Sequence, residues 1–330
     1  MTKPVAVVTG GAGFIGSHMV DRLIEEGYRV RVIDDLSGGH DANLSHLRNE
    51  PALSVECTDI RDIEPASSVF DDVQLVFHFA GIGDIVPSIE RPTDYMSVNV
   101  QGTVRVLEAA RRNNARRFVY AASSSCYGLA ETPTNESHPI ECRYPYAMSK
   151  YLGESAVLHW GQVYGLPVNS IRIFNAYGVR SRTTGAYGAV FGVFLRQKIA
   201  GHPFTVVGDG SQRRDFLYVT DVVDAFFRAS VSPQLSRIWN LGAGAPQTVN
   251  RLVELLGGRV EYIPKRPGEP DCTWADISRI SSDLGWQPRV SFEEGVAMML
   301  ADIDRWRDAP LWDKASIANA TKTWFEYLKA

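Results

Sequence analysis

Two side chains that can share a proton lie four residues apart in the segment Pro145-Tyr146-Ala147-Met148-Ser149-Lys150. On a helix, this spacing places Tyr146 and Lys150 on one face, about one turn apart. A free tyrosine has a pKa near 10 and is a poor base at neutral pH, but a nearby ammonium group and the positively charged ring of an oxidised cofactor both favour its phenolate form. The pattern therefore predicts that Tyr146 is a general base assisted by Lys150.

Serine hydroxyls follow a predicted strand that ends at Ala122. The sequence continues Ser123-Ser124-Ser125-Cys126-Tyr127-Gly128, so the serines would lie at the edge of a sheet. A serine hydroxyl can hydrogen-bond both a substrate oxygen and the tyrosine, and can carry a proton between them. One of these serines is therefore predicted to complete the catalytic group.

A glycine-rich turn precedes the first predicted helix. It reads Thr9-Gly10-Gly11-Ala12-Gly13-Phe14-Ile15-Gly16 and contains both a GxxGxxG and a GxGxxG spacing. Because the turn follows a strand, its glycines permit a tight turn, let the backbone approach a pyrophosphate and bring helix and strand together. The helix N-terminus adds N–H groups and a positive dipole end. The sequence thus predicts a dinucleotide site that includes Gly10, Gly13, Phe14, Ile15 and Gly16.

Asp34 ends the second predicted strand, 18 residues beyond Gly16. A carboxylate there accepts hydrogen bonds from the adenosine ribose and repels a 2′-phosphate, which favours NAD over NADP. The neighbouring Asp35 could share this role. Further walls of the cofactor site are predicted at the ends of the next strands, where ordinary packing is nearly as good an explanation: Asp59, Ile60, Phe79, Ala80 and Gly81.

Short β-branched runs alternate with longer helical stretches in the N-terminal half. Strands joined by crossover helices form a parallel sheet that is covered on both faces, so the predicted fold is α/β with a doubly wound Rossmann sheet. The predicted strands span residues 5–9, 29–34, 54–57, 75–79, 118–122 and 168–174, and the predicted helices span 14–26, 95–113 and 146–164.

Beyond Asn175 the alternation gives way to Gly-rich and Arg-containing connections and shorter helices. We therefore expect an NAD-binding domain over residues 1–178 and a smaller, mainly substrate-binding domain over 179–330. A strand at 238–241 could rejoin the sheet, so segments near 215–245 are predicted to return to the first domain. The two regions would then interleave.

Composition excludes several classes of function. The chain has 330 residues, of which 45% are hydrophobic, and its net charge of −4 offers no global positive field to nucleic acid or an anionic membrane. No apolar run approaches the roughly 20 residues that span a bilayer, and no signal peptide precedes the first strand, so we expect a cytoplasmic protein. The four cysteines lack CxxC spacing and a nearby histidine cluster, which predicts free thiols and no metal site.

With these features the sequence resembles the extended short-chain dehydrogenase/reductase family. Within that family it is similar to the NAD-dependent epimerase/dehydratase group that acts on nucleotide sugars, of the UDP-glucose 4-epimerase type. The resemblance covers nearly the whole chain. Besides the glycine turn and the Tyr146/Lys150 pair, it rests on Ser97-Val98-Asn99-Val100-Gln101-Gly102-Thr103, Arg172-Ile173-Phe174-Asn175-Ala176-Tyr177-Gly178, Gly208-Asp209-Gly210-Ser211-Gln212-Arg213-Arg214-Asp215-Phe216 and Arg266-Pro267-Gly268-Glu269.

The resemblance implies roles for individual residues. Counting back four residues from the Tyr of the family's Tyr-Gly pair puts the catalytic hydroxyl at Ser123, with Ser124 as the alternative, and Asn99 would support the active-site helix beside the cofactor. Arginines match phosphate oxygens bidentately and a glutamate accepts from ribose hydroxyls, although surface solvation would also explain Arg213, Arg214 and Arg266. The nucleotide-diphosphate sugar would be held by Ser124, Ser125, Asn175, Arg182, Arg214, Arg266 and Glu269.

Members of the group share a first step, in which the tyrosinate removes the C4 hydroxyl proton while hydride passes to the nicotinamide. The dehydratases carry Asp-Glu after the catalytic Thr, whereas this chain has Ser124-Ser125, which argues against 4,6-dehydration. Decarboxylases and uronate epimerases must recognise a C5 carboxylate, and Arg182, Thr183 and Thr184 could do so.

A 4-epimerase needs only room for the keto sugar to turn over, and the sequence fits this requirement best. We therefore expect an NAD-dependent nucleotide-sugar 4-epimerase. The alternatives are a C4 dehydrogenase, a uronate epimerase, a decarboxylase, or an NAD-binding sensor without turnover. The presence of Ser123, Tyr146 and Lys150 together argues against the sensor.

Two positions depart from the family's pattern and leave the sugar open. Asp84 stands in Ala80-Gly81-Ile82-Gly83-Asp84, where UDP-galactose epimerases usually carry a Lys after Ala-Gly-x, and it could bind sugar hydroxyls. Thr273 is smaller than some residues found at that wall of the sugar site, which favours a larger sugar. The resemblance also implies a homodimer, in which the helices near 95–113 and 146–164 form a four-helix bundle.

Overall fold

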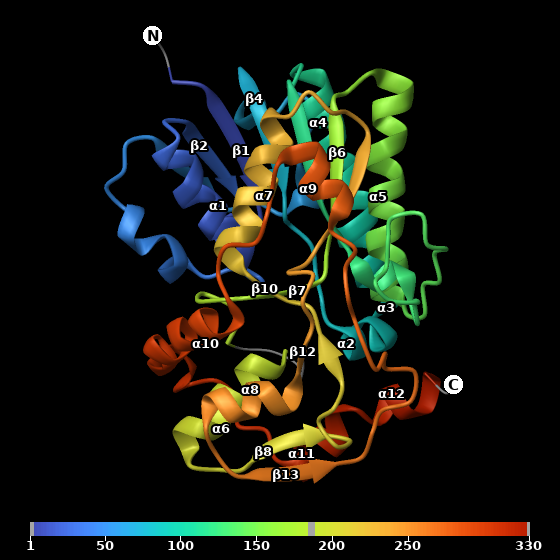
Figure 1. The fold of residues 1–330 in the computed structure, drawn as a ribbon. Coiled ribbons are helices and arrows are strands. Elements are labelled where there is room, and N and C mark those ends of the chain that lie inside the picture. The colour runs from blue at the N-terminus through green and yellow to red at the C-terminus, as the bar shows by residue number, and fades with distance from the viewer. Residues whose placement is uncertain (1–2, 184–188, 329–330) are drawn as a thin grey trace.

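A parallel sheet forms the N-terminal part of the protein in the computed structural model, which describes residues 3–183 and 189–328. Its seven strands follow the order β11-β6-β5-β4-β1-β2-β3, and every neighbouring pair is parallel (Figure 1). The predicted α/β fold is confirmed, and the predicted strands are displaced at their ends by at most two residues. The strands are β1 (Val5–Thr9), β2 (Arg29–Ile33), β3 (Leu53–Glu56), β4 (Val73–His78), β5 (Arg117–Ser123), β6 (Val168–Ile173) and β11 (Arg237–Leu241).

Helices cover both faces of this sheet, so its central strands are apolar on both sides. Along β1, Ala6 and Val8 enter one core, and Val7 enters the core on the opposite face. The first face is covered by α1 (Phe14–Glu25), α7 (Val219–Val231) and α9 (Ser278–Leu284), and the second by α4 (Thr103–Arg112) and α5 (Pro145–Tyr164).

The helix predicted over residues 95–113 is not uniform. It consists of α3 (Pro92–Met96), a π-helical segment at Ser97–Gly102, and α4. Asn99 lies in the π-helical segment, and its side chain bonds both backbone groups of Ile82, accepting from the N–H at 2.8 Å and donating to the carbonyl at 3.0 Å. The predicted helix is therefore confirmed, and at the contact with Ile82 it contains a local π-helical widening of the kind that often marks functional sites.

A second region follows the sheet and has its own aromatic core. Tyr177, Phe191, Phe216 and Phe292 pack together there, with Tyr177 and Phe191 stacked at 4.6 Å between ring centroids. Figure 1 shows this region below the sheet. Its strand pairs are β7 (Asn175–Tyr177) with β10 (Phe216–Tyr218), β8 (Phe204–Val207) with β13 (Val260–Ile263), and β9 (Arg213–Arg214) with β12 (Gln247–Thr248). Its helices are α6 (Val190–Ala200), α8 (Val249–Leu256), α10 (Phe292–Ala301), α11 (Lys314–Ala320) and α12 (Lys322–Tyr327).

The remaining elements are short. The helix α2 (Ile85–Glu90) follows β4 and lies next to α12, far from it in sequence (Figure 1). Short 3-10 helices occupy Asp41–Leu47, Ile60–Asp62, Ser68–Phe70, Ser124–Tyr127 and Ile303–Trp306. Over the described ranges, no helix has the length and apolar character needed to cross a bilayer.

Candidate active site

Two adjoining cavities lie at the carboxyl edge of the sheet. The larger, of about 1070 Å³, follows the glycine turn and the ends of β2 and β4, and we call it the cofactor cavity. Every residue predicted to bind the cofactor lines it, except Asn99. The smaller, of about 460 Å³, extends into the second region, and we call it the substrate cavity. All seven residues predicted to bind the substrate line this one.

The glycine turn forms a cradle for an anion at the N-terminus of α1. Gly10 has a φ of +70°, which favours glycine, and a Cβ at Gly16 would collide with the Gly10 carbonyl oxygen. The backbone can therefore approach a ligand closely at the point where the helix begins. These features fit a dinucleotide pyrophosphate.

Asp34 holds the glycine turn against the end of β2. Its carboxylate accepts hydrogen bonds from the N–H groups of Ala12 and Leu36, each at 2.9 Å. Burial raises its pKa, while the backbone hydrogen bonds oppose that rise. Oδ2 accepts the bond from Ala12 and Oδ1 accepts the bond from Leu36. Each oxygen therefore retains a lone pair that can accept a hydrogen bond from a ribose hydroxyl.

Asp59 is paired within the protein. Its carboxylate accepts from the Arg61 Nε at 3.0 Å, and this contact lowers the pKa of Asp59. Arg61 itself lines the cofactor cavity and was not predicted as a site residue. The sequence did not identify Arg61 as a site residue because Arg61 belongs to no recognisable binding motif.

Ser123 and Tyr146 lie where the two cavities meet, and both line each cavity. Ser123 ends β5, and its Oγ donates to the Ser125 Oγ at 2.9 Å. Tyr146 is in the first turn of α5. Burial raises the pKa of Tyr146, and a hydrogen bond with Ser123 opposes this rise. The chain by itself therefore keeps the phenol protonated at neutral pH, and a nearby positive charge is needed to ionise it.

Lys150 lies one turn further along α5 and lines the cofactor cavity. Its Nζ is 4.4 Å from the centroid of the Tyr120 ring. Burial lowers the pKa of Lys150 to about 7, against the opposing charge of Glu154. The ammonium form is thus finely balanced near neutral pH.

Glu154 and Arg172 fix α5 to the sheet. Arg172, on β6, donates from Nε to the two Glu154 oxygens at 3.1 and 3.0 Å, and Ser170 donates to one of them at 3.0 Å. Both charged side chains are at most 4% exposed. A buried ion pair destabilises a protein unless both charges are hydrogen-bonded. Since α5 carries Glu154 and β6 carries Arg172, the hydrogen bonds of this pair form only when α5 is correctly placed on the sheet.

Asn99 contacts the same helix from the π-helical segment. Its Nδ2 donates to the Ser149 Oγ at 2.9 Å, and Ser149 donates to the Tyr146 carbonyl oxygen at 2.9 Å. Asn99 therefore lies behind the wall of the cofactor cavity and links the loop after β4 to the start of α5.

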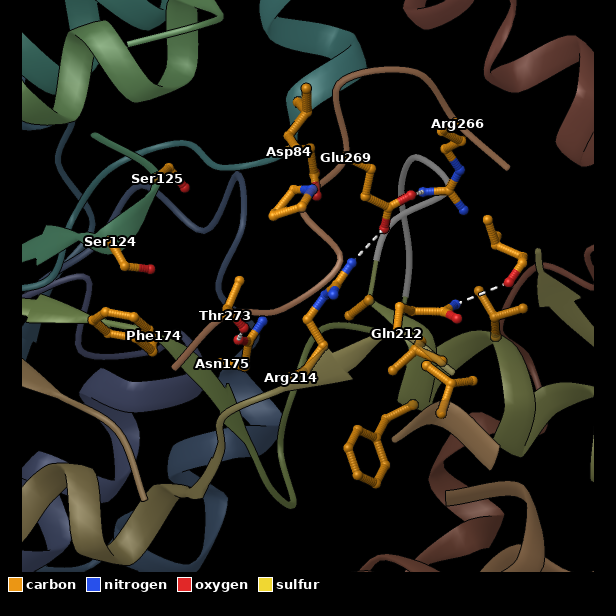
Figure 2. A pocket seen from close by; sticks show the side chains of 18 of the residues that line it. Asp84, Ser124, Ser125, Phe174, Asn175, Gln212, Arg214, Arg266, Glu269 and Thr273 are labelled. Carbon is orange, nitrogen blue, oxygen red and sulfur yellow. Dashed lines mark hydrogen bonds and ion pairs between the residues drawn. The ribbon is translucent and has the colours of Figure 1, made fainter. Parts of the chain in front are cut away.

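Charged side chains converge at one end of the substrate cavity, as Figure 2 shows. Arg214 Nη2 is 2.8 Å from Glu269 Oε1, and Arg266 Nη1 is 3.6 Å from Glu269 Oε2. The side chains of Arg214 and Arg266 are only 12% and 13% exposed, which argues against surface solvation for both. Arg213 is exposed, so surface solvation fits that residue.

Asn175 and Thr273 lie next to each other in the substrate cavity (Figure 2). The Thr273 Oγ1 donates to the Asn175 Oδ1 at 2.6 Å. Asn175 lines both cavities, and Thr273 lines the substrate cavity only. This hydrogen bond orients the Asn175 side-chain amide.

Asp84 and Arg182 also line both cavities. Asp84 immediately precedes α2 with a φ of +76°, a strained value for a residue with a side chain. Burial raises the pKa of Asp84, and Arg182 opposes that rise. Of the hydroxyl groups predicted beside Arg182, Thr184 falls outside the described residues.

Several side chains of the substrate cavity carry no motif and were missed by sequence reasoning. Arg143 and Tyr144 directly precede α5, which carries Tyr146 and Lys150, and that proximity was the available signal. Phe174 lies in the segment 172–178, in which only Asn175 was predicted to bind the substrate. Thr321 lies between α11 and α12 and Trp324 is on α12, and no local sequence motif marks either residue.

Within residues 3–183 and 189–328, no cluster of three or more His, Cys, Asp or Glu side chains is placed to bind a metal ion. The four cysteines are unpaired, and Cys126 is buried.

Residues 6–242 match the sequence profile described as the NAD dependent epimerase/dehydratase family. The chain belongs to this family. The UDP-glucose 4-epimerase of Mycolicibacterium smegmatis is 36% identical over 300 residues, which are 88% of this chain and 96% of that protein. UDP-glucuronic acid decarboxylase 1 of Arabidopsis thaliana is 34% identical over 90% of this chain and 69% of its own.

A solved structure of UDP-glucuronic acid 4-epimerase from Bacillus cereus, in complex with UDP-glucuronic acid and NAD, superposes with a TM-score of 0.85. The identity is 27%, over 91% of this chain and 99% of that one. Together the family, these relatives and the parallel sheet confirm two predictions, namely an NAD-dependent nucleotide-sugar epimerase of the extended short-chain dehydrogenase/reductase type and NAD as its cofactor.

Proposed function

We propose that this protein interconverts the C4 epimers of a neutral UDP-hexose. The observation that carries the proposal is the position of Ser123 and Tyr146 on the boundary of the two cavities, where a sugar and a nicotinamide can meet. The names of the relatives support a UDP-sugar, and three residues with acid–base or anion-binding groups, Arg214, Arg266 and Glu269, are suited to its diphosphate and ribose.

In the proposed reaction, Tyr146 as phenolate accepts the proton of the C4 hydroxyl and returns it after the keto sugar has turned over. Ser123 hydrogen-bonds the same oxygen and carries the proton for the epimer whose hydroxyl faces away from Tyr146. NAD held in the cofactor cavity by the glycine turn and Asp34 would supply a reversible hydride acceptor for C4 and a positive charge beside the phenol. Lys150 stabilises the phenolate through its ammonium group.

A neutral sugar is favoured over a uronate by the pairing of Arg182. Its Nη1 is 3.4 Å from Asp84 Oδ2, so the cation that would recognise a C5 carboxylate already faces a carboxylate of the protein. A uronate would bring a second negative charge to this pair, which costs binding energy. The second candidate is a uronate 4-epimerase or decarboxylase, because two of the relatives act on UDP-glucuronic acid by name.

The direct test follows the sugar by NMR. Purified protein is incubated with UDP-glucose, UDP-N-acetylglucosamine and UDP-glucuronic acid, each without added NADH. Appearance of the C4 epimer of a neutral sugar, with no accumulation of reduced nicotinamide, is the expected result. Stoichiometric reduction of NAD would instead indicate a dehydrogenase, and conversion of UDP-glucuronic acid alone would overturn the neutral-sugar proposal.

We also propose a homodimer formed through α4 and α5. Met148, Leu152 and Val163 are 39%, 38% and 52% exposed, and at 100° per residue they fall on one side of α5. Burying this apolar face against a second copy would stabilise an association. Sedimentation velocity should detect a dimer in the wild type and a monomer in Leu152→Glu, and a monomeric wild type would exclude this arrangement.

The cytoplasm is the compartment we propose for the protein. The overall charge of −4 offers no attraction to anionic membranes, in keeping with a protein that meets its nucleotide sugar in solution. Fractionation of cells that produce the protein tests this.

A further inference from the structure

The C-terminal helix α12 packs against α2, more than 200 residues away in sequence. Val86, Trp324 and Leu328 form a buried apolar cluster there, and Tyr144 from the start of α5 is packed against it. Thr323 adds a hydrogen bond to Glu90 at 3.0 Å. The C-terminal helix is thus joined to elements that carry residues of the substrate cavity, since Asp84 precedes α2 and Tyr146 follows Tyr144.

Trp324 is the centre of this contact and also lines the substrate cavity. Its side chain is 5% exposed, and its indole N–H donates to the Pro267 carbonyl oxygen at 2.7 Å. The guanidinium carbon of Arg266 lies 5.6 Å from the centroid of its ring, within the range of a cation–π contact. One indole therefore touches both the backbone and a charged side chain of the loop that carries Arg266 and Glu269.

Gly268 lies in that loop, between Pro267 and Glu269. Its φ is +69°, and a Cβ placed on it would lie 3.3 Å from the Leu328 carbonyl oxygen and 3.5 Å from Arg143 Nη2. The loop is therefore confined between the end of the C-terminal segment and the residue that precedes Tyr144. Glu269, next in sequence, carries the ion pairs to Arg214 and Arg266 (Figure 2).

We propose that Trp324 is a positioning residue for the nucleotide end of the substrate cavity. By holding Pro267 and Arg266, it sets the loop at the place where Arg266 and Glu269 face Arg214. Because Trp324 also packs on α2, the same helix ties the nucleotide end of the cavity to Asp84 at its sugar end. This inference rests on the proposed function only in taking the ligand to be a uridine diphosphate sugar.

The test compares ligand affinities of the full-length protein and two variants. Trp324→Phe keeps most of the packing and removes the N–H donor, whereas Trp324→Ala removes both. Calorimetry with UDP and with NAD separates the two cavities. The affinity for UDP should fall about three- to tenfold in Trp324→Phe and at least about tenfold in Trp324→Ala, with NAD affinity unchanged within about twofold. Kinetics on the sugar should show a raised KM with a much smaller change in kcat.

Tyr327→Ala is the matched control, because Tyr327 is on the same helix but is 65% exposed. It should bind UDP as the wild type does. Unchanged UDP affinity in both Trp324 variants, or loss of NAD and UDP affinity to the same extent in Trp324→Phe, would overturn the proposal. If the wild type binds UDP but epimerises no sugar, the proposed function fails while the affinities still decide the role of Trp324.

Discussion

Asp84 and Arg182 face each other at the junction of the two cavities, with 3.4 Å between their nearest charged atoms. The two side chains come from segments almost 100 residues apart, the loop before α2 and the connection that follows β7. Their side chains are 30% and 47% exposed, so water screens the pair and its energy is modest, about 1 kcal/mol or less. A pair this weak can still discriminate between substrates that differ by one charge.

We predict that Asp84→Asn shifts the protein toward uronates. Removing the carboxylate frees Arg182 to meet a C5 carboxylate and removes a repulsion. The ratio of kcat/KM for UDP-glucuronic acid to that for UDP-glucose should rise by about fivefold, as about 1 kcal/mol allows. Asp304→Asn makes the same change of charge at a remote, 81% exposed side chain and should leave the ratio alone. A ratio that stays constant in Asp84→Asn would refute the role of this pair.

Tyr146→Phe should fold and bind NAD but lose at least about two orders of magnitude in rate, the usual range for a lost general base. The Tyr146 ring stacks on the Tyr144 ring with 6.4 Å between centroids, and a phenylalanine ring keeps the aromatic surface for this contact. NMR turnover and NAD titration measure the two properties separately. Tyr164→Phe, at the exposed end of the same helix, is the control and should be fully active. Turnover near the wild-type rate in Tyr146→Phe would rule out the proposed mechanism.

Local chemistry explains why so much of the cofactor cavity could be predicted. The glycine turn, the strand before it and Asp34 lie within one βαβ unit. Their spacing along a short stretch of chain is therefore enough to predict a dinucleotide site. The structure accordingly places β1 at the predicted residues, and Gly10, Gly16 and Asp34 around one cavity.

The rest of the site depends on long-range packing that has no local signature. Trp324 lines the substrate cavity from a C-terminal helix, α12, that packs on α2 more than 200 residues earlier in the chain. The π-helical turn at Asn99 likewise involves the backbone of Ile82, 17 residues away. Periodicity reports which face of a helix is apolar but not which distant segment covers it.

Asp34→Ala should narrow the preference for NAD over NADP, because the carboxylate that repels a 2′-phosphate is lost. It should also destabilise the fold by about 1 to 3 kcal/mol, since the N–H groups of Ala12 and Leu36 lose their acceptor. Dissociation constants for both cofactors and thermal melts measure these effects. Asp35→Ala separates the two candidates, as Asp35 is exposed and bonds only Ser37 among the contacts described. An unchanged NAD to NADP ratio in Asp34→Ala would exclude the assignment.

Lys150→Met should stabilise the fold of the cofactor-free protein, and this gain in folding stability over the wild type should depend on pH. Burial lowers the pKa of Lys150 from 10.5 to about 7. Below pH 7 both the folded and unfolded chains hold the proton, and the folded chain bears the full cost of the buried charge, on the order of a few kcal/mol. Between pH 7 and 10.5 only the unfolded chain keeps it, so wild-type stability rises with pH and the gain in the variant should shrink. Melting temperatures at pH 6.5 and 10 measure this. Lys198→Met, at an exposed position, should show no such trend, and a gain independent of pH in Lys150→Met would contradict a lowered pKa.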